Sequence, residues 1–492
     1  MRTFEGLWLD RTARATLQDQ LARQIKALIQ RGVIAAGEAL PSTRALATEL
    51  KVSRNTAVYA YDRLISEGYL ETQSRSGVFV SSSIMLSRHS KWPSETAGAL
   101  LTAEETPLPT RLGAPAPFRP CQPDVGLFPL LVWNRMRGRV LRSDGRSLLH
   151  YQAASVSGLP ALRESVAAYL RDSRGVRCEG RQVVITSGSQ QALFILATLL
   201  LRPNDQVYVE DPGYVEARQA WSHAGARIVA GPVDEQGLVL PGKHAGTISL
   251  IYTTPSRQFP TGVSLSLARR LALIDFAGST KCWVIEDDYD SELSYSAPPL
   301  PSLQSLDRSG RVIYVGTFSK LLFPSLRLGY AVVPEPLLDG FNDLKHLIDD
   351  HLPLIDQATL AEFLESGAFY SHIRRCRRAY AERQALFVRL FKGSDLPLRF
   401  EHTDGGMNLT GFLADGTDDG AWSDKLRGAG FDVPALSRYA LKSTRPGLIF
   451  GFTAFRPEVI TASFQRMCGV LEAAADHRPA RARATPRARS KP

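Results

Sequence analysis

Cysteine is scarce in this sequence, and no long apolar run occurs in it. The five cysteines among 492 residues lie far apart without a CxxC pair, so we expect reduced thiols in a cytoplasmic protein and neither a disulfide framework nor a metal site. The longest apolar run, residues 192–201, is about half as long as a bilayer span. Glu5 and Asp10 interrupt the start of the chain, so neither a membrane span nor a secretory signal is expected.

The composition also lacks the bias of a fibrous or disordered chain. Hydrophobic residues make up 44% of the sequence, charged residues 22% and aromatic residues 9%, which is typical of a globular protein. The length favours more than one domain. Of the net charge of +10, residues 1–81 carry +3 and residues 478–492 carry +6, so the positive charge that would attract a nucleic acid lies at the two ends.

Composition divides the chain into four segments. We expect a small helical domain with a strand pair over 1–81 and a flexible linker rich in Ser, Thr and Pro over 82–112. A large domain follows over 113–475, and a basic disordered tail over 476–492. In the large domain, apolar β-rich stretches alternate with helical patterns, which predicts an α/β fold with a mainly parallel sheet.

Residues 1–81 have the pattern of a winged helix-turn-helix. A first helix is predicted by an apolar stripe formed by Leu17, Leu21, Ile25 and Leu28. Residues 43–50 predict a second helix, and Ser53 is a good N-cap for a third, which runs to about Glu67 and ends at Gly68. The residues of the third helix that we expect to face inward are Ala57, Tyr61, Leu64 and Ile65. Residues 71–80 predict two short strands, the wing.

The start of the third helix is the candidate DNA reader. Arg54 can bond guanine and Asn55 can bond adenine in the major groove, while the helix N-terminus with Ser53 or Thr56 can meet a phosphate. Polar residues at a helix start are otherwise ordinary caps, so the whole arrangement carries the prediction. The predicted DNA-binding residues are Arg44, Ser53, Arg54, Asn55, Thr56, Ser76 and Gly77.

These residues resemble a known family of regulators. The run from Leu40 (LPSTRALATELKVSRNTAVYAYDRLISEGYL) and residues 77–80 (GVFV) are similar to the GntR family of bacterial winged-helix regulators over about 65 residues. The elements LPSTR, VSRNT and EGYL stand at the family's spacing. The resemblance implies a dimer that reads two half-sites of a double-stranded DNA operator.

In the large domain, Lys320 is the most informative residue. It ends the sequence GTFSK, residues 316–320, directly after a predicted strand at residues 312–315. A lysine at a strand end beside hydroxyl residues, with Arg327 seven positions later, suits a Schiff base with an aldehyde cofactor and a guanidinium on the cofactor's phosphate. A single lysine is otherwise most often a surface residue, so its neighbours carry the prediction.

Three further segments follow predicted strands. The strand at residues 282–286 leads to Asp287, which suits a protonated pyridine nitrogen, and to Tyr289, which suits the ring hydroxyl. Residues 186–191 (TSGSQQ) form a strand-to-helix turn that binds phosphate readily. Tyr214, in the sequence DPGY, could stack on a cofactor ring. Taken alone, Asp287 and the aspartate that follows it can simply cap a turn, and a tyrosine can simply pack in a core.

Together with residues 157–163 (SGLPALR) and 254–262 (TPSRQFPTG), these segments resemble fold-type I pyridoxal 5′-phosphate (PLP) aminotransferases over about 113–475. With its GntR-like reader, the whole chain resembles the MocR subfamily of GntR regulators, whose aminotransferase-like domain senses a ligand. The resemblance implies a head-to-tail homodimer, an aldimine of PLP with Lys320, and Asp287 at the pyridine nitrogen. The expected cofactor-binding residues are Ser189, Gln190, Tyr214, Asp287, Tyr289, Thr317, Ser319, Lys320 and Arg327.

The sequence departs from this pattern where a ligand is expected. The subfamily commonly has His where this chain has Arg257. Aminotransferases carry a carboxylate-binding arginine where it has Ile449, and the GABA-sensing members use an arginine where it has Glu216. A buried carboxylate without a cation is costly. An α-amino acid or GABA held in those ways is therefore less expected, although Arg445 or Arg456 could substitute.

Three functions remain open on the sequence. The first is a PLP-dependent transcriptional regulator, in which an amine or amino-acid-like effector attacks the Lys320 aldimine and changes DNA binding. The second is a working aminotransferase with an accessory DNA-binding domain, against which the missing carboxylate arginine counts. The third is a sensor of PLP itself. The sequence favours the regulator and leaves residual transaminase turnover open.

Overall fold

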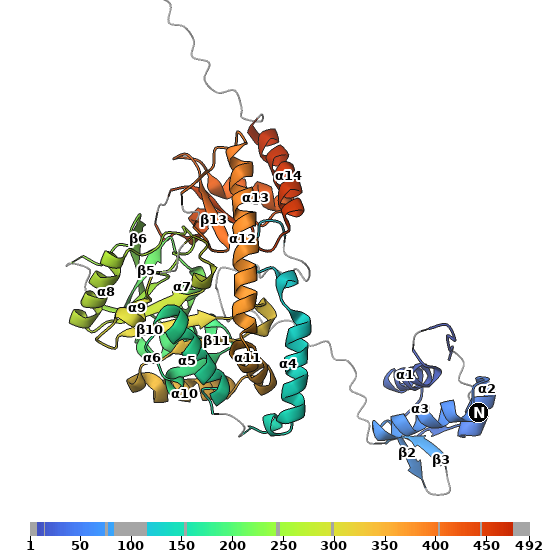
Figure 1. Ribbon diagram of the computed structural model, residues 1–492. Coiled ribbons are helices and arrows are strands. Elements are labelled where there is room, and N and C mark those ends of the chain that lie inside the picture. The colour runs from blue at the N-terminus through green and yellow to red at the C-terminus, as the bar shows by residue number, and fades with distance from the viewer. Residues whose placement is uncertain are drawn as a thin grey trace, which may run out of the picture. The chain divides into compact units, whose positions relative to one another are not determined.

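The computed structural model describes residues 7–13, 15–73, 77–82, 116–151, 155–242, 247–296, 300–401, 404–442 and 445–475. The chain divides into two compact units, Met1–Arg111 and Leu112–Pro492, and each is described by itself (Figure 1). Nearly all of the predicted linker, 82–112, and all of the predicted tail, 476–492, lie outside the described residues.

In its described residues, the N-terminal unit contains three helices and a three-stranded sheet. The elements are α1 (Leu17–Gln30), β1 (Ala39–Leu40), α2 (Thr43–Glu49), α3 (Arg54–Ser66), β2 (Leu70–Gln73) and β3 (Gly77–Val80). The strands are antiparallel in the order β1-β3-β2. Apolar side chains of all three helices form one core with Leu70 and Val80. The predicted helix-turn-helix with its strand pair is confirmed.

Helix α3 begins and ends for the reasons that the sequence indicates. The Ser53 hydroxyl accepts a hydrogen bond from the Thr56 N–H at 3.1 Å and caps the first turn. Gly68 has a φ of +77°, which favours glycine, and the helix stops just before it. The buried apolar residues of α3 are Ala57, Ala60, Tyr61 and Leu64. Ile65 also faces inward as expected, because it packs against this core, although it is only half-buried.

A large sheet organises the C-terminal unit. Its strands are β4 (Val183–Thr186), β5 (Gln206–Asp211), β6 (Arg227–Asp234), β7 (Gly237–Leu238), β8 (Ile248–Thr253), β9 (Trp283–Asp288), β10 (Val312–Thr317) and β11 (Gly329–Val332). The order of the eight strands is β4-β11-β10-β9-β8-β5-β6-β7. Strands β6, β5, β8, β9 and β10 run parallel, while β11 and β7 run against their neighbours. The predicted α/β fold with a mainly parallel sheet is confirmed.

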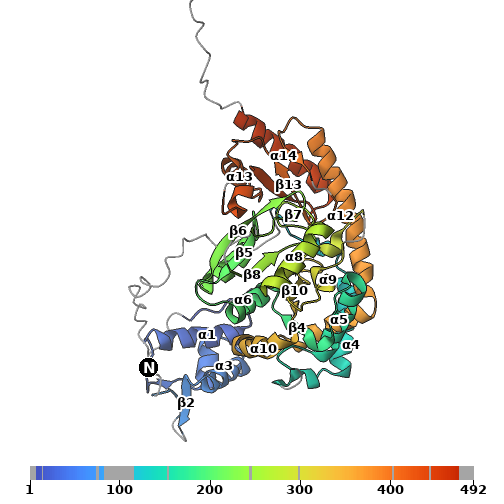
Figure 2. The ribbon, with the colours of Figure 1, turned by 90° about the vertical axis from the view of Figure 1, so that its left-hand side faces the viewer.

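Helices cover both faces of this sheet (Figures 1 and 2). The helices around the sheet, which pack on it or on one another, are α4 (Leu130–Ser143), α5 (Pro160–Arg174), α6 (Ser189–Leu200), α7 (Val215–His223), α8 (Leu267–Thr280), α9 (Leu303–Leu306), α10 (Glu335–Asp349), α11 (Leu354–Glu365) and α12 (Ala368–Lys392). Successive strand side chains point to opposite faces. In β10, Ile313 and Val315 join a core cluster with α6, α7 and α10. Val312 packs with α8 and α9, and Tyr314 belongs to the cluster of α5, α11 and α12.

A smaller lobe ends the C-terminal unit. Its elements are β12 (Arg399–Phe400), β13 (Asn408–Phe412), α13 (Asp419–Gly428), β14 (Gly447–Gly451) and α14 (Pro457–Ala475), with the strands antiparallel in that order. The 25-residue helix α12 reaches from the large sheet to this lobe (Figure 1). Near its start, Phe369 packs against Phe318. Near its end, Phe387 and Phe391 pack against Phe450.

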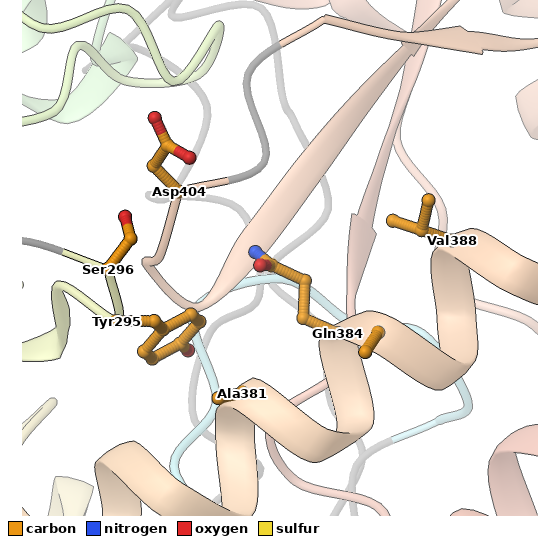
Figure 3. A pocket seen from close by; sticks show the side chains of 7 residues that line it. Tyr295, Ser296, Ala381, Gln384, Val388 and Asp404 are labelled. Carbon is orange, nitrogen blue, oxygen red and sulfur yellow. The ribbon is translucent and has the colours of Figure 1, made fainter.

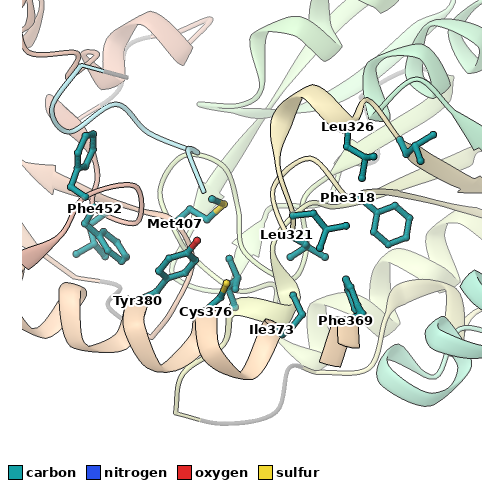
Figure 4. Close-up of a cluster of buried hydrophobic side chains, with 14 of the residues drawn as sticks. Phe318, Leu321, Leu326, Phe369, Ile373, Cys376, Tyr380, Met407 and Phe452 are labelled. Atoms are coloured by element: carbon teal, nitrogen blue, oxygen red, sulfur yellow. The ribbon is translucent and has the colours of Figure 1, made fainter. Parts of the chain in front are cut away.

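One apolar cluster supports the segment that follows β10. Phe318 and Leu321 are buried in it, and they face Phe369 and Ile373 of α12 (Figure 4). Because the residues on both sides of Ser319 and Lys320 are buried and apolar, the backbone of this short segment is held in place.

Among the described helices, none combines the length and the apolar character that crossing a bilayer requires. The same part of the chain contains no group of three or more His, Cys, Asp or Glu side chains that could hold a metal ion.

Candidate functional site

The segments predicted to form the site meet at one edge of the large sheet. Strands β9 and β10 are adjacent and parallel, with Asp288 opposite Gly316. Thr317 lies opposite Gly329 of β11, which lies opposite Thr186 of β4. The ends of β4, β9 and β10 therefore lie close together, at the edge where open α/β sheets bind ligands.

Lys320 lies in the turn after β10, and its amine is held by a distant segment. Lys320 Nζ donates a hydrogen bond to the Cys121 carbonyl at 3.1 Å. Thr317 and Ser319 are buried, and the Ser319 N–H donates to the Thr317 hydroxyl at 3.2 Å. Ser319 Oγ has no hydrogen-bond partner among the described residues. Thr317, Ser319 and Lys320 thus lie together, and Lys320 contacts Cys121, which the sequence does not indicate as a site residue.

The two carboxyl groups at the end of β9 have different surroundings. Asp288 accepts hydrogen bonds from Arg174 Nε at 2.9 Å and from the Tyr314 hydroxyl at 2.6 Å. Burial raises the pKa of Asp288, but these two partners outweigh burial and hold the pKa below its usual range. Asp287 accepts one hydrogen bond, from the Tyr252 hydroxyl at 2.7 Å, and its Oδ1 has no partner in the described part of the chain. Burial raises the pKa of Asp287 to about 7. Asp287 is therefore the carboxyl group with an oxygen free for a ligand.

The turn before α6 and Arg327 form a corner suited to an anion. The Arg327 guanidinium donates to the Ser187 carbonyl at 2.9 Å. A side chain at Gly188 would come within 3.4 Å of this guanidinium, so the glycine keeps space open beside the arginine. Ser189 and Gln190 begin α6, a twelve-residue helix whose first N–H groups favour negative charge. The predicted phosphate residues thus lie together in the fold.

Tyr214 and Tyr289 both pack against Phe259. The ring centroids are 6.0 Å and 6.1 Å from that of Phe259, and both contacts are edge to face. Burial raises the pKa of each tyrosine above its ordinary value, so both hydroxyls are protonated at neutral pH. The fold gathers the two predicted tyrosines into one aromatic group, and their roles toward a cofactor stay predictions.

The residues considered for holding an effector carboxylate do not form a site. Ile449 is fully buried in a small apolar cluster, and Glu216 is exposed. Arg445 is exposed and forms an ion pair with Glu401 at 2.7 Å. Arg456 is exposed as well. Water competes for a carboxylate at both exposed positions. Neither arginine therefore supplies the buried cation that the sequence leaves open.

The residues predicted to contact DNA are mostly exposed. Arg54 and Asn55 are exposed in the first turn of α3, and Arg44 is exposed on α2. Thr56 differs, because it is buried and its hydroxyl is bonded to the Ser53 hydroxyl at 2.9 Å. Both the hydroxyl and the backbone N–H of Thr56 therefore serve the helix cap through Ser53, and the predicted phosphate contact of Thr56 stays a prediction.

In the wing, Gly77 begins β3 with a φ of +115°, and no other atom lies within 4 Å of where a side chain would stand. The position is open enough to approach a nucleic-acid backbone. Ser76 lies outside the described residues, so its contact and that of Gly77 stay predictions.

A cavity of about 450 Å³ lies apart from the residues predicted to bind the cofactor. It is formed between α12 and the segments of Tyr295 and Asp404 (Figure 3). Gln384 Nε2 donates to the Gly405 carbonyl at 3.1 Å, and the Tyr295 hydroxyl donates to the carbonyl of the next residue, Gly406, at 2.5 Å. The cavity wall therefore holds the backbone of Gly405 and Gly406 in place.

Comparison with known families identifies both units. The family described as "Bacterial regulatory proteins, gntR family" matches residues 17–80, and "Aminotransferase class I and II" matches residues 132–424. The fold and the site thus define a helix-turn-helix protein fused to an aminotransferase-like domain.

Individual relatives extend over almost the whole chain. The chain is 38% identical over 466 residues to the "Probable rhizopine catabolism regulatory protein MocR" of Rhizobium meliloti, covering 92% of this chain and 93% of that protein. It is 33% identical over 442 residues to the pyridoxine biosynthesis regulator PdxR of Corynebacterium glutamicum, covering 89% and 92%. Among solved structures, LysN, an α-aminoadipate aminotransferase of Thermus thermophilus, matches with a TM-score of 0.67 at 27% identity, covering 73% and 93%. The chain belongs to the MocR subfamily of GntR-family transcriptional regulators, which confirms the resemblance seen in the sequence.

Proposed function

We propose that this regulator binds PLP at Lys320 and that a small amine or amino-acid-like effector, or PLP itself, acts there to change its affinity for a double-stranded DNA operator. The observation that carries the proposal is the buried carboxyl of Asp287, which has one oxygen without a partner among the described residues. Asp287 is near enough to Lys320 for the lysine's charge to lower its pKa, against the larger effect of burial.

The residues of the site fit PLP group by group. Asp287 Oδ1 lacks a donor within the described part of the chain, and a protonated pyridine nitrogen would supply one. Ser319 Oγ also lacks a partner there, and together with Arg327 and the N-terminus of α6 it offers the donors that a phosphate group needs. When bound, PLP supplies an aldehyde that reacts with amines and a ring that accepts electrons. Lys320 supplies the amine.

Each side chain then has a defined task. Ionised Asp287 keeps a proton on the ring nitrogen, because its charge favours the protonated form. Arg174 and Tyr314 bind the neighbouring Asp288 and so leave Asp287 as the free carboxyl group. An effector amine competes with Lys320 Nζ in this site. For DNA binding to respond, the effector must bind two arrangements of the protein with affinities that differ about 5- to 150-fold.

The substitution Lys320→Ala tests the proposal. We expect the variant to lose the absorbance that PLP acquires on binding to the wild type and to lose the response of DNA affinity to amines, while operator binding itself remains measurable. Lys392→Ala, at an exposed position of α12, is the matched control and should behave as the wild type. A Lys320→Ala protein whose DNA affinity still answers the effector would overturn the proposal.

A second candidate function is a working aminotransferase. Lys320, Asp287 and Arg327 lie at one sheet edge, and this set would also serve catalysis. The two functions differ in turnover with several amino donors and a keto-acid acceptor. Multiple turnovers at about 1 s⁻¹, within the usual range of enzymes, would favour the aminotransferase, and single-turnover behaviour would favour the regulator.

We further propose a homodimer, in the head-to-tail arrangement predicted from the sequence. Large apolar side chains are exposed at Leu131 of α4, at Tyr151 after η2 (Ser147–Leu149), and at Leu347 of α10, with exposed fractions of 82%, 81% and 80%. The Tyr151 ring lies 6.3 Å from the His351 ring, so the exposed surface at Tyr151 continues onto the segment that follows α10. Such a face is suited to a second copy of the chain. Sedimentation should give a dimer for the wild type and a monomer for the double variant Leu131→Asp/Leu347→Asp; a monomeric wild type would refute the proposal.

A further inference from the structure

Arg257 is a buried arginine near the site that the proposed function does not use. It lies in the loop after β8, and its side chain is only 10% exposed. Its closest charged neighbour is Asp290, whose Oδ2 lies 3.9 Å from Arg257 Nε, which is too far for a hydrogen bond. Within the described part of the chain, the guanidinium donates no hydrogen bond. The Arg257 guanidinium therefore keeps donors that a ligand can take up without displacing a protein partner.

The loop that carries Arg257 is fixed on both sides. Before Arg257, the Ser256 hydroxyl accepts from Arg174 at 2.7 Å. After it, the Pro260 carbonyl accepts from the Thr410 hydroxyl at 2.6 Å. The arginine is therefore presented by a rigid loop, and a ligand that binds it loses little free energy to ordering the backbone.

Two glycines leave space for the guanidinium. A side chain at Gly405 would come within 2.7 Å of a guanidinium nitrogen of Arg257. A side chain at Gly406 would come within 2.5 Å of Arg257 Cδ and within 3.0 Å of Asp290 Oδ2. These are the glycines whose carbonyls are bonded to Gln384 and Tyr295 at the cavity wall. The cavity wall thus fixes the two glycines next to Arg257, where any residue with a side chain would collide with the arginine.

Asp290 connects Arg257 with Lys320. Its carboxyl is 1% exposed, and neither oxygen has a hydrogen-bond partner among the described residues. Burial raises the pKa of Asp290 to about 7, and the charges of both Arg257 and Lys320 act on it in the opposite direction. The charge of Arg257 also acts on Tyr289, one of the predicted cofactor residues. The geometry agrees, because Phe259, two positions after Arg257, packs against Tyr289 with the ring centroids 6.1 Å apart, so the Arg257 loop lies beside the predicted cofactor residues.

We propose that Arg257 binds a carboxylate of the effector, so that the effector class is an amine that carries one carboxylate. The inference rests on the proposed function, because it places the effector amine at Lys320. A guanidinium presents paired N–H groups that match the two oxygens of a carboxylate. A dianionic group such as a phosphate fits less well, since Asp290 already offsets part of the positive charge.

The test compares amino acids with the same amines without the carboxylate. The PLP-bound wild type is titrated with glycine and methylamine, with β-alanine and ethylamine, and with 4-aminobutyrate and propylamine. The absorbance of the bound cofactor gives an apparent Kd for each. We expect one amino acid or more to bind roughly 10- to 100-fold more tightly than its matched amine, the range of a charge-assisted hydrogen bond.

Arg257→Met should bring the ratio of the Kd of the amine to the Kd of its matched amino acid close to one, without changing the Kd of the amine. Arg257→Lys, which keeps the charge, should retain part of the preference. Arg445→Met is the matched control, because Arg445 is exposed and paired with Glu401, and it should leave the ratio unchanged. If the Met variant fails to hold the cofactor, Arg257→Gln decides the matter by the same ratio.

The outcomes separate the inference from the proposed function. If neither amines nor amino acids change the absorbance of the wild type, the proposed function fails. If amines bind but no amino acid is preferred, or if Arg257→Met keeps the preference, the inference about Arg257 is overturned while the proposed function stands.

Discussion

Replacing Asp287 by Asn should make the cofactor-free protein more stable at pH 8. Burial raises the pKa of Asp287 from 3.8 to about 7 in the folded chain. Ionising this carboxyl at pH 8 therefore costs about 4 kcal/mol, since a tenfold change in acidity corresponds to about 1.4 kcal/mol. A carboxyl whose folded pKa exceeds its unfolded pKa makes stability fall as the pH rises between the two values. Asparagine carries no charge and still accepts the Tyr252 hydrogen bond, so the variant escapes this loss.

The assay is urea unfolding of the cofactor-free wild type and variant, followed by tryptophan fluorescence at pH 5 and pH 8. The gain in the variant should be about 3 kcal/mol larger at pH 8 than at pH 5, because about two pH units of the interval between the unfolded and the folded pKa lie above pH 5, at about 1.4 kcal/mol each. Asp288→Asn is the control and should be less stable at both pH values, since it weakens the contacts with Arg174 and Tyr314.

The same variant should bind PLP more weakly, because the ring nitrogen loses its charged partner. Added PLP should therefore raise the unfolding free energy of the wild type more than that of Asp287→Asn. Equal stabilisation of the two proteins by PLP, or an Asp287→Asn protein that is less stable than the wild type at pH 8, would refute the reasoning.

Three other changes probe the rest of the chain. Arg54→Ala should reduce the difference in binding free energy between operator and nonspecific DNA by about 1–3 kcal/mol at fixed salt. Fluorescence anisotropy measures both affinities, and an unchanged difference would mean that Arg54 reads no base. Arg174→Met should cost about 3–5 kcal/mol in urea unfolding, because Asp288 stays buried without its cation; a loss below about 1 kcal/mol would contradict this. Ser53→Ala should lower the stability of the N-terminal unit by about 1 kcal/mol through loss of the α3 cap, and unchanged thermal unfolding would argue against the cap.

Part of the site can be predicted from sequence because strand ends meet in a parallel sheet. Lys320 and Asp287 each follow an apolar strand, so the fold class alone places them at one edge. The contacts of Lys320 with Cys121 and of Asp288 with Arg174 join residues 199 and 114 positions apart. Such pairs form only when the chain folds, so no local pattern in the sequence indicates them.

The fold shows the same division between local and long-range information. Helix α3 is predictable because its cap, its apolar stripe and its terminal glycine are all local. Strands β1 and β7 have two residues each, which is too few to show an alternation. Thr56 belongs to the polar first turn of α3, but its burial depends on packing that the sequence does not display.

Helix α12 connects the lysine's surroundings to the small lobe as one continuous rod. At its start, His372 donates to the carbonyl of Leu321, the residue after Lys320, at 2.9 Å. Gly367, with a φ of +75°, precedes the helix. With 25 residues, the rod is roughly 37 Å long, so a tilt of about 5° at Gly367 would carry its far end about 3 Å sideways. That is the length of a hydrogen bond, and α12 has the proportions of a lever arm that amplifies a small shift beside one lysine into a displacement large enough to make or break a contact at the lobe.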